Sequence, residues 1–226
     1  MKLILFGASG MIGQAALREC LVDPEVTAVL AIGRSPLGRP DEKLRELVLP
    51  DVGQLSAVAN ELIGYDGCLW CLGVTSAGKS EAEYRRVTYD LTVSAARTLA
   101  HIDPGMTFVY VSGAGTDSTE HGRAMWARVK GATENALLAM PFRAAYMFRP
   151  GIIRAMHGIR SRTRAYRIVY AVLSPFLLLV RIVAPNAMTS TERVGRAMIR
   201  VVRDGAPKRI LSTRDINALG APPGPR

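Results

Sequence analysis

Over the first 150 residues of this 226-residue chain, short apolar runs alternate with longer stretches whose apolar residues recur every three or four positions. Short apolar runs between turn residues are typical of buried strands, and the longer recurrence is typical of amphipathic helices. The pattern predicts strands at Lys2–Phe6, 26–32, 47–49, 67–72, Thr107–Val111 and 144–148, and helices at Met11–Val22, 55–63, 82–101 and 122–140. This alternation indicates the α/β class, with a doubly wound parallel sheet in the strand order 3-2-1-4-5-6.

The pattern changes after the sixth predicted strand. Residues 160–184 favour a helix, and its apolar run at 169–180 is about 12 residues long, whereas a bilayer-spanning helix needs about 20. A further helix is expected at 189–203, with Ser190 or Thr191 as its N-cap, and a short strand at 209–211. We therefore expect an α/β domain at 1–153, a small, largely helical C-terminal segment at 154–212 and a flexible tail at 213–226.

Three glycines lie between the first predicted strand and the first predicted helix. Gly7, Gly10 and Gly13 are spaced so that the chain can turn tightly, let a pyrophosphate approach the backbone, and pack the helix closely on the sheet. The N-terminus of the helix would offer unpaired N–H groups and a positive dipole end to that pyrophosphate. Residues 1–153 are thus predicted to form a Rossmann-type dinucleotide-binding domain, which binds the cofactor through Gly7, Ser9, Gly10, Met11, Ile12 and Gly13.

The end of the second predicted strand indicates which dinucleotide is bound. An NAD site usually has an Asp or Glu here to hold the ribose 2′-hydroxyl. This chain has no acid at that point and has Arg34 instead, followed by Ser35. A guanidinium group can bind a 2′-phosphate through two hydrogen bonds. We therefore expect NADP(H) rather than NAD, with Arg34 and Ser35 as ligands of the phosphate.

Charge is distributed unevenly along the chain. The formal net charge is +10, and no acidic residue occurs between Glu134 and Glu192. This asymmetry favours an anionic partner, either a phosphorylated cofactor or substrate or a membrane surface. The apolar segment 160–184 with its flanking arginines is expected to form a pair of helices over the cofactor cleft, and peripheral membrane contact is the alternative. Nucleic acid is disfavoured because no aromatic residues interleave with the basic ones.

The three cysteines argue against a disulfide scaffold and for a reducing compartment. The N-terminus lacks the pattern of a secretory signal peptide, so a cytoplasmic protein is expected, with contact at the inner face of a membrane as a variant of that prediction. Cys68 and Cys71 form a C-x-x-C pattern, but residues three apart on a strand point to opposite faces. They are therefore expected to be packed core thiols, and no metal site is predicted.

The order of motifs over residues 1–153 resembles that of the short-chain dehydrogenase/reductase superfamily. The resemblance is closest to its atypical and extended-like members, the NmrA-like and NAD(P)H-binding epimerase-like proteins. It rests on the glycines at 7–13 and on later residues that follow successive strands: Asp51, Val52, Leu72, Gly73, Ser112, Lys130, Arg149, Pro150 and Gly151.

The resemblance implies a role for each of these positions. Asp51 and Val52 would contact the adenine, and Leu72 and Gly73 would pass under the cofactor. Lys130 would bind the nicotinamide ribose, and Ser112 would orient a substrate carbonyl. The backbone at Pro150, Gly151 and Ile152 would face the nicotinamide amide.

The catalytic acid of that superfamily is missing. Its tyrosine lies four residues before the lysine, on the same helical face, and here that position is Trp126. An indole N–H has no usable acidity. The proton could come from Tyr89, Tyr84 or His121, or from water relayed by Ser112 and Lys130. Thr88 also stands where the superfamily often has an asparagine.

The sequence thus predicts an NADP(H)-dependent oxidoreductase or epimerase-like enzyme with an unusual proton donor, acting on an apolar or anionic small molecule. The predicted catalytic residues are Ser112, Lys130 and Tyr89. The alternative is a nonenzymatic NADP(H)-binding regulator or scaffold, and both a monomer and a homodimer are compatible with the sequence.

Overall fold

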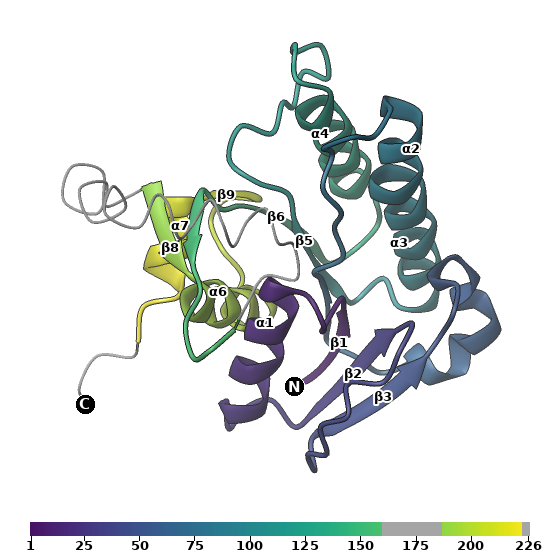
Figure 1. Cartoon of the computed structure of the whole chain (residues 1–226). Coiled ribbons are helices and arrows are strands. Elements are labelled where there is room, and N and C mark those ends of the chain that lie inside the picture. Colours follow the sequence, from purple (N-terminus) through teal and green to yellow (C-terminus); the bar gives the residue numbers. More distant parts are fainter. Residues whose placement is uncertain (160–186, 223–226) are drawn as a thin grey trace.

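In the part of the chain that the structure describes, a seven-stranded parallel sheet forms the centre (Figure 1). The computed structural model describes residues 1–159 and 187–222. The strand order is β3-β2-β1-β4-β5-β6-β9, and every neighbouring pair is parallel. The strands are β1 (Lys2–Phe6), β2 (Ala28–Gly33), β3 (Leu44–Val48), β4 (Gly67–Trp70), β5 (Thr107–Val111), β6 (Ala144–Arg149) and β9 (Ile210–Ser212). The predicted α/β class and the order 3-2-1-4-5-6 are confirmed, with one strand added beyond β6.

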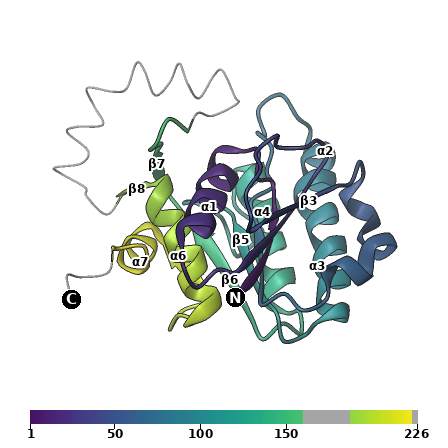
Figure 2. The ribbon, with the colours of Figure 1, turned by 90° about the horizontal axis from the view of Figure 1, so that it is seen from below.

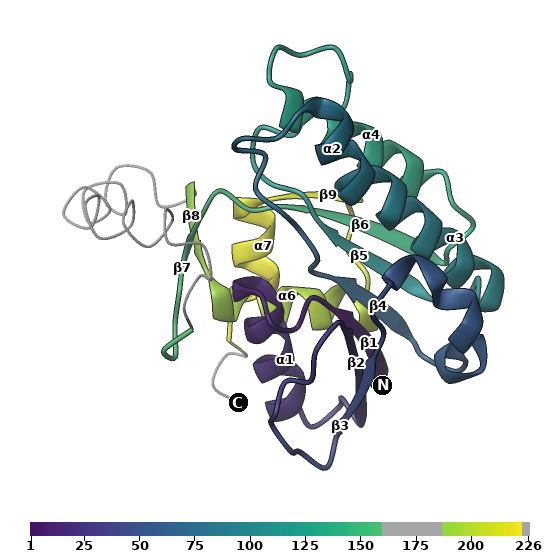
Figure 3. The same ribbon diagram turned by 45° about the vertical axis from the view of Figure 1, so that its right-hand side comes forward.

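Helices cover both faces of the sheet (Figure 3). One face carries α1 (Met11–Val22), α6 (Thr191–Arg203) and α7 (Thr213–Leu219). The other carries η1 (Val52–Leu62), α2 (Glu81–Arg85), η2 (Arg86–Asp90), α3 (Leu91–Ile102) and α4 (Met125–Leu138). Strand residues alternate between the two cores: Leu3 and Leu5 pack towards α1 and α6, whereas Ile4 and Phe6 pack towards α3. Burial on both faces explains why these strands are continuously apolar.

The structure differs from the predicted elements mainly at two helices. The predicted helix at 55–63 is the 3-10 helix η1, which has non-helical torsions at Gln54 and Val58. The predicted helix at 82–101 consists of α2, the π-helical turn η2 and α3. Single π-helical turns inside helices occur frequently at functional sites. This one places Val87 and Leu91 on the wall of the cavity described below.

The C-terminal part of the chain belongs to the same layers as the N-terminal part. After the short parallel pair β7 (Ile152–Arg154) and β8 (Met188–Ser190), α6 packs against α1 (Figure 2). Strand β9 then pairs with β6. Residues 188–219 are therefore not a separate appendage, contrary to the predicted boundary at 153. The Ser190 side chain caps α6, as one of the two predicted alternatives.

The prediction of a flexible tail at 213–226 is wrong for residues 213–219, which form α7. A capping box starts this helix: the Ser212 hydroxyl accepts a hydrogen bond from the Asp215 N–H, and the Asp215 carboxylate accepts one from the Ser212 N–H. Such reciprocal bonds satisfy N–H groups that a helix start otherwise leaves unpaired. Ile216 then buries its side chain in the core beside α6.

The two cysteines of the C-x-x-C pattern lie on opposite faces of the sheet, as predicted. Cys68 is part of the core beneath α3, whereas Cys71 packs against the core beneath α1. Burial raises the pKa of the Cys71 thiol to about 12, and it also raises the pKa of Cys68. Both are therefore protonated at neutral pH and poor nucleophiles.

Within the described residues, no helix has the length and apolar character that crossing a membrane would require. The segment 160–184, for which a pair of helices or membrane contact was predicted, lies outside the described residues.

The close contact between α1 and α6 provides a test of whether the C-terminal part is integral to the fold. A Cβ atom at Gly195 would lie 2.8 Å from Cγ of Glu19 and 3.0 Å from the carbonyl oxygen of Ala15. We expect Gly195→Val to lower the free energy of unfolding by about 1–3 kcal/mol, because overpacking forces the two helices apart. Urea denaturation followed by circular dichroism measures this, with Gly33→Ala as the control, since a Cβ there meets only an ordinary contact at 3.8 Å. An unchanged unfolding midpoint in Gly195→Val would show that α6 is dispensable for the domain.

Candidate cofactor site

The turn after β1 (residues 7–13, the glycine turn) brings three backbone segments into contact. Gly7 has φ +76°, and a Cβ there would lie 2.8 Å from the carbonyl carbon of Cys71. A Cβ at Gly13 would lie 2.0 Å from the carbonyl oxygen of Gly7. No other residue type fits at these two positions without moving backbone. The Gly10 N–H donates to the Gly7 carbonyl oxygen at 2.9 Å, which closes the turn.

The first turn of α1 has the properties of an anion site. Gly10 is its N-cap and supplies no side-chain hydrogen bond, and the first turn contains no acidic residue. The N–H groups at the start of a helix and its positive dipole end bind phosphate when nothing else occupies them. Met11 and Ile12 are the first residues of this turn. The glycine turn and the start of α1 thus fit the pyrophosphate of a dinucleotide.

A cavity of about 870 Å³ opens at the carboxyl ends of β1, β2 and β4, beside the glycine turn. This volume lies within the range typical of small-molecule sites. Half of the predicted cofactor ligands line it: Gly7, Ser9, Arg34, Ser35, Asp51, Val52, Leu72 and Gly73. Asp51 is also the N-cap of η1, where its carboxylate accepts a hydrogen bond from the Gly53 N–H at 2.8 Å.

Several lining residues were not predicted from the sequence. Gln14, Leu17 and Arg18 lie on one face of α1, Arg39 lies in the loop after β2, and the loop after β7 contributes residues 157–159. The spacing of 14, 17 and 18 on one helical face was a usable signal, because positions three and four apart are neighbours. The loop positions carried no such signal.

The cavity wall has a marked positive charge. Arg18, Arg34 and Arg39 all line it. Arg34 and Arg39 are exposed, and within residues 1–159 and 187–222 neither makes an ion pair. Two acidic residues, Glu46 and Asp51, also line the cavity. The Glu46 carboxylate accepts a hydrogen bond from the Leu37 N–H at 2.6 Å and so holds the loop after β2, while the Asp51 carboxylate caps η1.

A buried polar cluster lies at the carboxyl ends of β5 and β6, where the catalytic residues were expected. The Ser112 side chain is 6% exposed, and its hydroxyl donates to the carboxylate of Glu134, which has no solvent exposure. Arg149 donates to both oxygens of the same carboxylate. Lys130 donates from Nζ to the backbone carbonyl of Ser112. A buried carboxylate is stable only when paired and hydrogen-bonded, and Arg149 and Ser112 meet this requirement for Glu134.

Burial changes the acidity of Lys130. Desolvation lowers its pKa to about 8, while the charge of Glu134 one helical turn away opposes this shift. An ammonium group with this pKa releases a proton much more readily than an ordinary lysine. Within the cluster, Lys130 is thus the group best suited to proton transfer near neutral pH.

The other predicted sources of a proton have different partners. The Trp126 ring packs at Gly115, where a Cβ would lie 3.4 Å from it. The Tyr89 ring stacks beneath the guanidinium group of Arg85, 4.0 Å from the ring centroid. Tyr84 is 2% exposed, and His121 lies in the loop that Asp117 organises. No hydrogen bond links Tyr89 to Lys130 or Ser112 in the part of the chain described, so its catalytic role stays a prediction.

The predicted nicotinamide ligands lie at the end of β6. The Gly151 N–H donates to the Thr213 hydroxyl at 2.8 Å, and the Pro150 carbonyl accepts from the Ala114 N–H at 2.9 Å. Neither these residues nor Ile152 are among the described residues that line the cavity. Their role towards the nicotinamide therefore stays a prediction, as does that of Lys130 towards the ribose.

Comparison with known structures identifies the fold. The chain aligns with the enzyme WbmG of Bordetella bronchiseptica in complex with NAD at a TM-score of 0.66 and 12% identity, covering 97% of this chain and 77% of that one. A short-chain dehydrogenase/reductase of Saccharomyces cerevisiae aligns at a TM-score of 0.63 and 16% identity, covering 96% and 97%. The chain thus has the fold of these proteins.

Sequence comparison finds closer relatives, although no family profile matches the chain. The mitochondrial protein fmp52 of Aspergillus fumigatus is 30% identical over 167 residues, which are 71% of this chain and 68% of that protein. Protein HTATIP2 of Rattus norvegicus is 28% identical over 154 residues, 67% of this chain and 62% of that protein. The leucinostatins biosynthesis cluster protein T of Purpureocillium lilacinum is 30% identical over 122 residues, which are less than half of its length, 45%.

These relatives contradict the predicted cytoplasmic localisation. The fmp52 proteins of Aspergillus fumigatus, Aspergillus niger and Emericella nidulans are each named as mitochondrial. The prediction rested on the cysteine count and on the missing signal-peptide pattern. Neither observation separates the cytoplasm from another reducing compartment.

The glycine turn, the sheet order and the extent of the sequence match agree with one another. The chain belongs to the family of the fmp52 proteins, which are atypical members of the short-chain dehydrogenase/reductase superfamily.

Proposed function

We propose that the protein binds NADP(H), with the pyrophosphate at the glycine turn and the 2′-phosphate among Arg18, Arg34 and Arg39. The observation that carries the proposal is that these arginines line the same cavity as Gly7 and Ser9. Arginine side chains suit a phosphate dianion because the guanidinium group is always charged and binds with two parallel hydrogen bonds. The end of β2 supplies Arg34 at the point where an NAD site would have an acid.

The remaining lining residues fit the rest of the nucleotide. Asp51 and Val52 lie at the start of η1, where they would meet the adenine, and Leu72 and Gly73 follow β4. A Cβ at Gly73 would meet nothing within 4 Å, so the backbone there leaves open space for a ligand. Leu72 and Val74 provide apolar surface on either side of it.

The cofactor assignment is tested by replacing Arg34. We expect Arg34→Ala to weaken NADPH binding by about tenfold to a hundredfold, because a charge-assisted hydrogen bond contributes about 1.5–3 kcal/mol. NADH binding should hardly change, since NADH lacks the 2′-phosphate. Both dissociation constants are measured by isothermal titration calorimetry.

The matched control is Arg45→Ala. Arg45 is an exposed arginine on β3 that pairs with Glu61 and is not among the residues lining the cavity. It should leave both constants unchanged. If Arg34→Ala and Arg45→Ala give the same ratio of NADPH to NADH affinity, the assignment of NADP(H) through Arg34 is incorrect.

We further propose that the protein is an NADP(H)-dependent oxidoreductase acting on an apolar or anionic carbonyl compound, with Lys130 as the proton donor. NADPH, when bound at the glycine turn, would supply the hydride that the carbonyl carbon accepts. Lys130 transfers a proton from its Nζ to the carbonyl oxygen and recovers it from solvent. The lowered pKa of Lys130 supports this role, because a general acid works best when its pKa lies near the operating pH. Glu134 and Arg149 position the helix face that carries Lys130.

The pH dependence of turnover tests the role of Lys130. The protonated form is the donor, so kcat/KM for carbonyl reduction should be constant at lower pH and fall as the pH rises through about 8. Lys130→Met should lower kcat by about a hundredfold to ten-thousandfold. Lys130→Arg retains the positive charge but cannot release a proton. Its kcat should therefore be as low as that of Lys130→Met. Because the charge is retained, Lys130→Arg should bind NADPH more tightly than Lys130→Met does. A wild-type profile without a decline near pH 8 would contradict the assignment.

A nonenzymatic NADP(H)-binding regulator is the second candidate. Two observations favour it: Trp126 stands in the position of the superfamily's acid, and the hydroxyl of Ser112 donates to Glu134 rather than facing the cavity. The two candidates differ in NADPH oxidation with a panel of quinones, aldehydes and enones. Complete absence of turnover by protein with NADPH bound would favour the regulator.

A further inference from the structure

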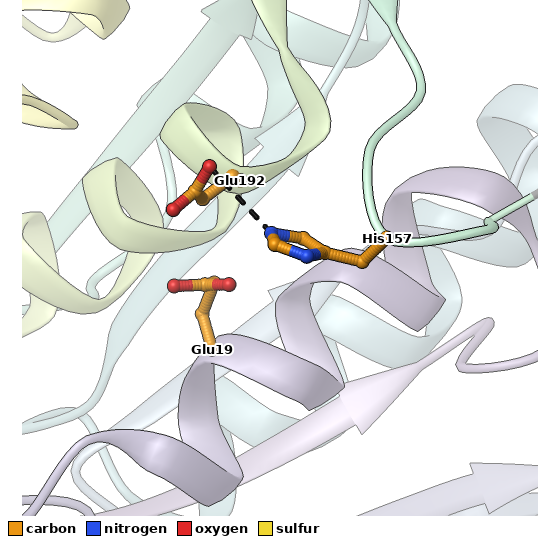
Figure 4. Close-up of side chains that lie close together, drawn as sticks. All are labelled: Glu19, His157 and Glu192. Carbon is orange, nitrogen blue, oxygen red and sulfur yellow. Dashed lines mark ion pairs between the residues drawn. The ribbon is translucent and has the colours of Figure 1, made fainter.

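A chain of ion pairs connects α1, α6 and the loop after β7 beside the cofactor cavity. Arg18 and Arg196 both donate to the carboxylate of Glu19, Arg196 also donates to Glu192, and the Nε2 atom of His157 lies 3.6 Å from Glu192. The three side chains Glu19, His157 and Glu192 point toward one another from three separate elements (Figure 4). The carboxylate side chain of Glu19 is only 3% exposed, so its two arginines are required for its burial.

Both ends of this chain of ion pairs reach the cavity. Arg18 lines the cavity from α1, and His157 lines it from the opposite loop, together with Gly158 and Ile159. The loop is anchored to the start of α6, because the Met156 N–H donates to the Thr191 hydroxyl at 3.0 Å. His157 is therefore held at the cavity wall on one side and at Glu192 on the other.

The same three residues have the spacing of a metal site, because their ligand atoms all lie within 4.8 Å of one another. The carboxylates, however, are already neutralised. Arg18 and Arg196 occupy oxygens of Glu19, and Arg196 occupies an oxygen of Glu192. A cation would have to displace two guanidinium groups, so this cluster does not favour a metal ion.

The charges decide what a proton on His157 would do. The two glutamates and two arginines sum to zero. Protonation of His157 adds one positive charge at the cavity wall, and the facing groups, Glu192 and Arg196 on α6 and Arg18 and Glu19 on α1, already compensate one another. From the loop after β2, Arg34 and Arg39 also line the cavity, and the lining carboxylates of Glu46 and Asp51 already accept hydrogen bonds from backbone N–H groups. Among the described lining residues the arginines outnumber these acids, so an anion that enters the cavity would compensate the added charge.

We propose that His157 is a proton-linked phosphate-binding residue, which takes up a proton when the 2′-phosphate of NADP(H) binds against Arg18 and the loop after β7. This inference rests on the proposed binding of NADP(H). By linkage, a ligand that favours the protonated form binds more tightly as the pH falls. Histidine suits this role because it changes charge between pH 5 and 8.

Calorimetric titration of the intact protein with NADP⁺ at pH 6, 7 and 8, in buffers of different ionisation enthalpy, measures the number of protons taken up. The wild-type protein should take up a fraction of a proton at pH 7. The phosphate monoester itself titrates near pH 6, so the measurement is made against His157→Asn, in which only the ligand's own titration remains. Asparagine is chosen because His157 has φ +54°, a conformation that asparagine tolerates.

We expect the ratio of wild-type to His157→Asn affinity for NADP⁺ to be about threefold to tenfold larger at pH 6 than at pH 8, since tenfold corresponds to one pKa unit. His157→Lys carries a fixed charge and should bind equally well at pH 6 and 8 after correction for the ligand. NAD⁺ should show no proton uptake that depends on His157. His101→Gln, a change in the last turn of α3 outside the cavity wall, should match the wild type.

The outcomes distinguish a failure of the role of His157 from a failure of the proposed NADP(H) binding. If wild-type protein does not bind NADP⁺ at any pH, the proposed function fails. If NADP⁺ binds but wild type and His157→Asn take up the same number of protons, the role of His157 fails while the proposed function stands. If His157→Asn does not fold, His157→Lys replaces it: its charge is fixed, so proton uptake should fall to that of the ligand alone, and uptake equal to that of the wild type would overturn the inference.

Discussion

The contact between Gly13 and the carbonyl oxygen of Gly7 is the constraint on which the cofactor site depends. A single carbon added at Gly13 would lie 2.0 Å from that oxygen, so α1 begins directly against the turn that ends β1. This contact aims the N-terminus of α1 at the space above the sheet. Because all seven strands are parallel, their carboxyl ends meet along the same edge, and the residues that follow β2, β3 and β4 gather around the glycine turn.

Burial of charge shapes the two polar regions beside the cavity. Glu134 has no exposure and is held by Arg149 and Ser112, and the same desolvation that requires those partners lowers the pKa of Lys130. Glu19 is almost as deeply buried and is held by Arg18 and Arg196. In both regions a buried carboxylate orders the cations around it. A buried ion pair of this kind contributes little net stability, but removing one partner is costly.

Local sequence patterns were sufficient for the fold and for part of the site. The apolar runs identified the strands, and the spacing of Gly7, Gly10 and Gly13 identified the turn, because each signal lies within a few residues. Arg34 was predictable for the same reason. The capping box of Ser212 and Asp215 was visible in the sequence and was missed because proline and glycine at 222–225 suggested a disordered end.

The other features depend on contacts between distant residues. Arg196 and Glu19 are 177 positions apart, and Glu134 is paired with Ser112 and Arg149 across two strands. The periodicity of a single sequence does not reveal such pairs. The role of Glu134 and the series of ion pairs that ends at His157 could therefore be recognised only in the structure. The localisation was not predictable from composition, because the cysteine count reports redox conditions and not an organelle.

The central claim is that the glycine turn and the arginines beside it hold a phosphorylated dinucleotide. The most direct measurement is an equilibrium titration of the wild-type protein with NADPH and, separately, with NADH, followed by the fluorescence of the bound nicotinamide. We expect saturable binding of one NADPH per chain, with NADH binding more weakly because it lacks the 2′-phosphate. Failure of both nucleotides to bind, or tighter binding of NADH than of NADPH, would contradict the central claim.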